Sequence, residues 1–125
     1  VWSSPSTRCT DTLAPYAAAA RLRIRTKASL SEEGFEQVPH KAARHVVRLL
    51  ERGEPSAICS HGPVLPDLME ALATRVDRAL PRHDQVVDLL EQAAEAKLVK
   101  GEALVCHVVG QDEDARIIAA ERHLP

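Results

Sequence analysis

The stretch from Ala57 to Leu72 constrains the fold of this chain more than any other. A short apolar run, Ala57 to Cys59, is followed by a Ser-His-Gly-Pro turn at 60–63 and then by apolar residues at helical spacing. This order predicts a strand, a sharp turn and a helix. Strands that alternate with helices are typical of a parallel sheet covered by helices on both faces. The turn places His61 at the carboxyl end of its strand, beside a helix N-terminus.

The remaining pattern predicts one domain of the α/β class. Strands are expected at 1–4, 22–26, 56–60, 102–109 and 115–121, and helices at 8–21, 39–51, 63–73 and 84–96. Segment 27–39 is expected to be a loop, 75–82 to be irregular or only partly helical, and 110–114 to be the tip of a hairpin. We therefore expect a mainly parallel sheet with helices on both faces, ending in a β-hairpin. A length of 125 residues suits one domain and not two.

Composition narrows the classes of partner. The formal net charge of -2 gives no global attraction to nucleic acid or to anionic membrane. Only three aromatic residues are present, too few for stacking platforms, so we expect no direct nucleic-acid binding. No apolar run is long enough for a membrane span, and no signal peptide is evident. Three widely spaced cysteines, Cys9, Cys59 and Cys106, suit a reducing cytoplasm.

A second turn, Ser-Ser-Pro-Ser-Thr-Arg at 3–8, follows the first expected strand. Small hydroxyl residues let backbone N–H groups approach an anion, and the Arg8 guanidinium can hold phosphate or carboxylate. An ordinary helix cap followed by a surface arginine is the alternative. If both strands lie in one parallel sheet, Arg8 and His61 converge on one site. His61 can donate to a phosphoryl oxygen or accept a proton there, and Gly62 permits a backbone angle that other residues avoid.

Taken together, Ser3-Ser4-Pro5-Ser6-Thr7-Arg8 and Cys59-Ser60-His61-Gly62 resemble the histidine phosphatase superfamily, which has the phosphoglycerate-mutase-like fold. In that family a Ser-Ser-Pro-x-x-Arg turn supplies a phosphate-binding arginine, and a downstream His-Gly supplies the second active-site histidine. The resemblance implies that Arg8 clamps phosphate and that His61 is catalytic, stabilising the transferring phosphoryl group. It also implies that substrate is bound by Ser4, Ser60 and Gly62.

Further segments narrow the resemblance. Residues 29–34, 59–66, 100–107 and 121–123 are similar to the phosphatase-like C-terminal domain of actinobacterial Nudix (MutT-like) hydrolases. In those proteins a Nudix domain comes first and hydrolyses nucleoside triphosphates, including oxidised guanine nucleotides, with a divalent metal. The resemblance therefore implies a role in sanitation of the nucleotide pool, Mg²⁺ for an attached Nudix domain, and no cofactor for this domain.

The chain lacks the family motif that contains the nucleophile. The family nucleophile is the histidine of an N-terminal Arg-His-Gly on the first strand, and no Arg-His-Gly occurs here. We therefore expect that the first strand and a Nudix domain precede residue 1, so that residues 1–125 form the C-terminal part of one histidine-phosphatase-like domain. Covalent catalysis needs the nucleophile, so this fragment alone should be inactive. The three Arg-His pairs that do occur, at 44–45, 82–83 and 122–123, do not fit the motif.

The sequence leaves open the role of two acidic residues and the function of the chain. Glu32 and Glu33 lie near where many relatives place a general acid, although a solvated acidic loop is the interpretation that such a run favours. No paired Cys or His residues have zinc spacing, so no metal is expected in this chain.

The expected function is a phosphohydrolase acting on nucleoside polyphosphates or their phosphorylated products, in partnership with the missing segment. The alternative is a catalytically idle partner or dimerisation module for the Nudix site; homo-oligomer formation is left open.

Overall fold

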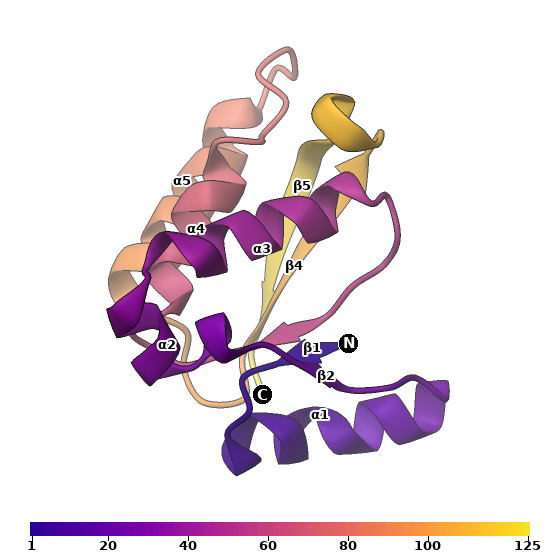
Figure 1. The fold of residues 1–125 in the computed structure, drawn as a ribbon. Coiled ribbons are helices and arrows are strands. Elements are labelled where there is room, and N and C mark those ends of the chain that lie inside the picture. The colour runs from indigo at the N-terminus through magenta and orange to yellow at the C-terminus, as the bar shows by residue number, and fades with distance from the viewer.

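Two separate sheets and five α-helices make up the fold, and this computed structural model describes all 125 residues (Figure 1). None of the helices combines the length and apolar character needed to cross a bilayer. The elements up to the centre of the chain are β1 (Trp2–Ser3), α1 (Thr7–Ala20), β2 (Arg25–Thr26), the 3-10 turn η1 (Ala28–Leu30), α2 (Glu32–Gln37), α3 (His40–Glu51) and β3 (Ile58–Cys59). The remaining elements are α4 (Leu65–Ala73), α5 (His83–Ala96), β4 (Ala103–Val109), the 3-10 turn η2 (Asp112–Asp114) and β5 (Arg116–His123).

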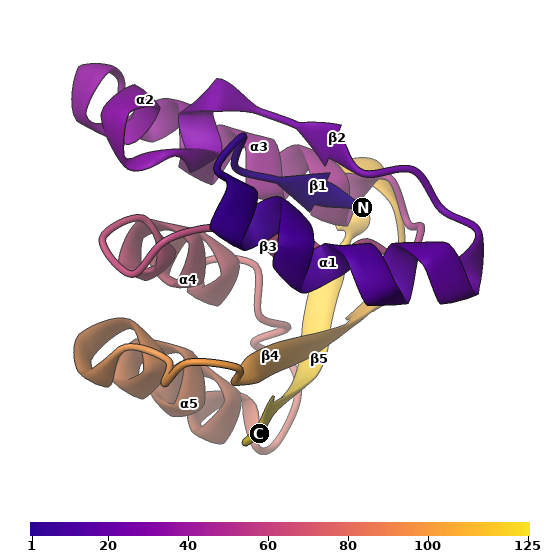
Figure 2. The same cartoon turned by 90° about the horizontal axis from the view of Figure 1, so that it is seen from below.

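The sheet that carries the candidate site is three-stranded and wholly parallel, in the order β2-β1-β3. Trp2 pairs with Arg25 on one side and with Ile58 on the other. Helix α1 lies on one face of this sheet and α3 on the opposite face (Figures 1 and 2). The α/β class, the parallel order, the position of β2 at an edge and the C-terminal hairpin are confirmed.

The hairpin differs from the expectation of one mainly parallel sheet. Strands β4 and β5, of seven and eight residues, pair only with each other as antiparallel strands, while each parallel strand has two residues. Gly110 at its tip has φ +85°, a conformation in which a side chain would be strained. Residue Val76 forms a parallel bridge to Ile117 of β5. The longest strands therefore form a second sheet that does not pair with the parallel strands.

The segment expected to be a loop, 27–39, contains η1 and the six-residue helix α2. Ser31 caps α2: its hydroxyl accepts a hydrogen bond from the backbone N–H of Gly34 at 3.0 Å. Glu32 and Glu33 occupy the first turn, where carboxylates interact favourably with the helix dipole. The loop prediction was wrong because it treated these capping residues as polar loop residues.

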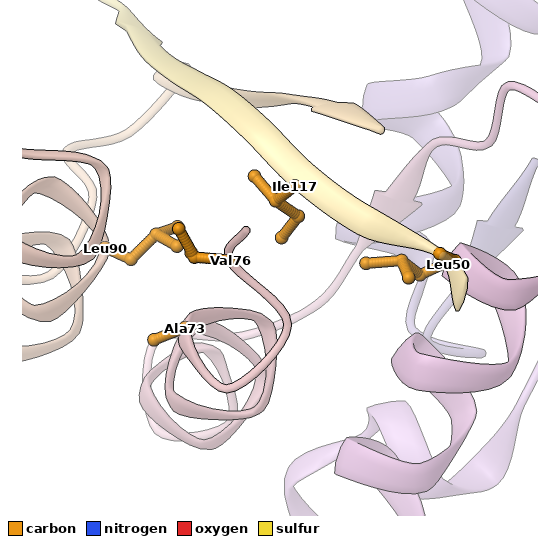
Figure 3. Packing of buried hydrophobic residues seen from close by; sticks show 6 residues of the cluster. Leu50, Ala73, Val76, Leu90 and Ile117 are labelled. Carbon is orange, nitrogen blue, oxygen red and sulfur yellow. The ribbon is translucent and has the colours of Figure 1, made fainter. Parts of the chain in front are cut away.

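Three hydrophobic clusters hold the layers together, and the smallest, formed by Met69, Ala93 and Ala94, joins α4 to α5. The first joins α3, α4, α5 and β5 around Leu90 and Ile117, both fully buried (Figure 3). Its other members are Leu50, Ala73, Val76 and Ala115. The second lies beneath the His61 turn and consists of Leu30, Ala42, Val46, Val64 and Leu68, with Trp2 and Ile58 of the parallel sheet packed against it. The second cluster anchors the carboxyl edge of the parallel sheet.

Candidate functional site

The two turns that follow β1 and β3 lie side by side. Because these strands pair in parallel, their carboxyl ends meet, and the Ser4 amide donates a hydrogen bond to the Cys59 carbonyl at 3.0 Å. The Ser4 hydroxyl lies 2.8 Å from Nε2 of His61. Ser4 is fully buried, and the side chain of His61 is only 9% exposed. The turns thus fix one imidazole against the end of the sheet.

Both nitrogens of the His61 ring have a partner. Besides Ser4, the Cys9 thiol lies 3.7 Å from Nε2, and the Glu32 carboxylate lies 3.6 Å from Nδ1. A neutral ring with its proton on Nδ1 satisfies these contacts, since Nε2 then accepts the Ser4 hydroxyl proton. The Nδ1–Glu32 separation exceeds a normal hydrogen bond, and half of the Glu32 side chain is exposed, so Glu32 is a long-range partner at the solvent side of the imidazole.

Glu32 is brought to His61 by the helix that the sequence did not predict. It is the first residue of α2, placed there by the Ser31 cap. Glu33, next along the chain, is exposed and forms no ion pair or side-chain hydrogen bond. Of the two acidic candidates, only Glu32 lies in the site. The Ser31-x-x-Gly34 spacing before and within α2 is the signal that could have located it.

The N-terminus of α1 forms the other wall. Ser6, its N-cap residue, makes no side-chain cap, and the N–H groups of Thr7 and Arg8 have no hydrogen-bond partner. Arg8 is exposed, and its guanidinium forms no ion pair with any carboxylate. Cys9, the next residue, contacts His61. Free N–H groups at a helix start, with an unpaired guanidinium, are suited to holding an anion.

Ser60 and Gly62 support the turn in different ways. The Ser60 hydroxyl donates to the Leu30 carbonyl at 2.6 Å, so its proton ties β3 to η1. Gly62 does not adopt a positive φ, so the turn does not use the backbone freedom that a glycine permits there. A Cβ atom at Gly62 would meet nothing within 4 Å, so the space beside the His61 turn is open.

Cys9 is the site residue that sequence reasoning missed. It is buried, and its thiol also donates to the Ser60 carbonyl at 3.6 Å. Burial, with the neighbouring Cys9 thiol as a further cause, raises the pKa of the Cys59 thiol to about 12. Cys9 follows Arg8 in the first turn of α1 and points toward the sheet, whereas Arg8 is exposed. Cys9 therefore packs against the imidazole, and Cys59 neighbours Cys9.

The site is an open edge without a metal-binding cluster. No group of three or more His, Cys, Asp or Glu side chains is arranged to hold a metal ion. Two surface depressions lie elsewhere, one between α3 and α4 and one beside the start of α5. No protein-family profile matches the sequence.

Proposed function

We propose that this chain is the phosphate-binding part of a phosphohydrolase of the histidine phosphatase type. The observation that carries this proposal is the line of contacts from Ser4 through His61 to Glu32, beside the uncapped start of α1. A structural histidine could account for the buried Nε2 contact alone. It would not account for the Glu32 carboxylate beside Nδ1, or for the free N–H groups and the unpaired Arg8 at the start of α1.

Each group has a role in such a reaction. The Arg8 guanidinium and the free N–H groups of Thr7 and Arg8 would hold the phosphoryl oxygens and stabilise charge as it shifts. His61, oriented by Ser4, would donate its Nδ1 proton to a phosphoryl oxygen. Glu32 would supply a proton to the leaving oxygen or, as a carboxylate, orient the ring. Ser60 would keep the turn in place.

The nucleophile would come from an upstream Arg-His-Gly strand. Its histidine nitrogen would attack phosphorus as the bond to the leaving oxygen breaks, and water would then release phosphate. The unpaired outer edge of β3 supports this proposal, because β3 pairs only with β1 and β4 pairs only with β5. A parallel strand beside β3 would end at the same edge as His61. The substrates proposed on the resemblance are nucleoside polyphosphates, including oxidised guanine nucleotides, or their phosphorylated products, with an attached Mg²⁺-dependent Nudix domain.

Phosphatase assays on a longer protein that includes such a strand test the proposal. His61→Ala should abolish turnover, and Arg8→Ala should mainly raise KM because it weakens phosphate binding. His40→Ala is the matched control, since His40 is an exposed histidine at the start of α3. Turnover that survives His61→Ala at the control's level would overturn the catalytic role.

One observation favours the alternative of a catalytically idle partner or dimerisation module. The hairpin exposes several large apolar side chains, among them Val105, Val109 and Ile118. Exposed apolar side chains of this size are typical of interaction surfaces when they form one patch. Under this alternative, Val109→Lys would disrupt assembly with the partner domain in size-exclusion chromatography, while His61→Ala would leave both assembly and turnover unchanged.

A further inference from the structure

The charges of this chain are strongly segregated. Segments 21–27 and 40–52 contain eight of the 16 Lys and Arg residues and one of the 18 Asp and Glu residues. These 20 residues therefore carry a net charge of +7, and the rest of the chain carries -9. The overall value of -2 hides this division.

Helix α3 presents one basic face. Its buried residues Ala42, Val46, Leu49 and Leu50 form one stripe toward the core. On the opposite side, the exposed cations are spaced three, four and four residues apart, which places them within an arc of about 80° and along about 17 Å of helix. These cations are Lys41, Arg44, Arg48 and Arg52.

The end of β2 adds two cations to this face. The guanidinium carbons of Arg25 and Arg52 lie 5.6 and 5.9 Å from the centre of the Trp2 ring, and Nζ of Lys27 lies 5.5 Å from it. His45 of α3 packs edge-on against the same ring, with centroids 4.8 Å apart. Burial, followed by the charges of Lys27, Arg52 and Arg48, lowers the pKa of His45. We call the six cations Arg25, Lys27, Lys41, Arg44, Arg48 and Arg52 the basic patch.

Nothing within the chain neutralises the basic patch. None of its six side chains forms an ion pair, and none donates a hydrogen bond. Like charges four residues apart, such as Arg44 and Arg48, destabilise a helix. The helix dipole favours cations near the C-terminus of α3, but it disfavours Lys41 in the first turn. The contacts with Trp2 stabilise Arg25, Lys27 and Arg52. No contact within the chain accounts for Lys41, Arg44 and Arg48, so folding stability does not explain the whole arrangement.

The expectation of no direct nucleic-acid binding rested on the net charge of the whole chain and on its few aromatic residues. The local charge leads to a different conclusion, and we infer that the basic patch binds the phosphate backbone of duplex nucleic acid. Four of the six cations are arginines, whose planar guanidinium groups suit phosphate oxygens. Base stacking is not part of the binding, because the aromatic ring at the patch, Trp2, is already faced by three cations and by His45. Single-stranded binders depend on such stacking, so the geometry favours a duplex. Binding is independent of base sequence.

Fluorescence anisotropy of the full chain with a labelled DNA duplex of about 20 base pairs, in about 50 mM salt, tests this inference. The double variant Arg44→Gln/Arg48→Gln should lower affinity about 100-fold, and log K for the unaltered chain should fall with log salt at a slope of about -5. Arg78→Gln/Arg82→Gln is the matched control, since it removes the same charge from exposed positions outside the patch. Screening should limit its effect to a few-fold. Trp2, the single tryptophan, should change its fluorescence on binding.

Three results would overturn the inference. They are equal losses of affinity in the two double variants, an unchanged Trp2 signal, and displacement of the duplex by polyglutamate as effectively as by unlabelled duplex. The last result would assign the patch to an acidic protein segment instead. All of these readouts are independent of phosphatase activity, so they stand apart from the function proposed for the His61 site.

Discussion

Replacement of Ser4 by alanine tests the central contact of the site. The Ser4 hydroxyl lies 2.8 Å from Nε2 of His61 and accepts a hydrogen bond from the Ser6 amide at 3.3 Å. Ser3→Ala is the matched control, because Ser3 is also fully buried but its hydroxyl donates only to the carbonyl of the adjacent residue. The two variants remove the same atom from neighbouring buried positions.

The expected magnitudes follow from what each variant leaves without a partner. Ser4→Ala removes the close partner of a largely buried imidazole nitrogen, and such a loss costs about 1–3 kcal/mol, so we expect about 2 kcal/mol. Ser3→Ala removes one local hydrogen bond, worth about 0.5–1 kcal/mol. In a domain of this size, the larger value lowers Tm by about 8 °C.

Urea unfolding followed by Trp2 fluorescence measures both free energies, and the ¹⁵N NMR signals of the His61 ring report the hydrogen bond at Nε2. Ser4→Ala should change the Nε2 signal, whereas Ser3→Ala should leave it unchanged. If the two variants lose the same free energy and neither alters the Nε2 signal, then Ser4 does not position the ring and the reasoning is refuted.

Three other changes test contacts away from this bond. Because burial and nearby cations lower the pKa of His45, its unfolded state binds protons more readily, so stability should fall as pH drops below about 6.5. His45→Phe, which also removes a buried Nε2 without a partner, should lessen this loss in urea titrations, and an unchanged pH profile would contradict the assignment. Burial raises the pKa of Cys106 to about 11, as it raises that of Cys59. Alkylation of Cys106 at about pH 8 should therefore be about 100-fold slower in the folded than in the unfolded protein, measured by peptide mass spectrometry. Arg75→Ala should cost about 2 kcal/mol in the same unfolding assay, because its guanidinium donates to Glu51 at 2.7 Å and to carbonyls of the hairpin turn, and a loss below about 0.5 kcal/mol would show that these bonds add little.

The sequence predicted a helix or strand correctly where the residue pattern of that segment alone specifies it. The apolar stripe of α3 and the glycine after it, Gly53 with φ +68°, predicted that helix and its end. The strand, turn and helix around His61 were predicted in the correct order, with Pro66 in the first turn of α4. The hairpin β4–β5 was predicted from two apolar runs around Gly110.

Prediction from residue patterns failed for short elements whose formation or bounds depend on contacts with other segments. Helix α2 has six residues and no buried side chain, so it lacks an apolar stripe. The parallel strands have two residues each, and their ends are set by pairing with β1 and not by composition.

The sequence by itself determined the α/β class, the helices with long apolar stripes and the candidacy of Arg8 and His61, because these depend on spacing within one segment. Tertiary structure decided which side chains meet. It placed Glu32 and Ser4 on opposite nitrogens of His61, although 57 residues separate Ser4 from that histidine. It also gathered cations from two segments around Trp2. Such contacts join residues distant in the chain, so they follow from packing and not from local pattern.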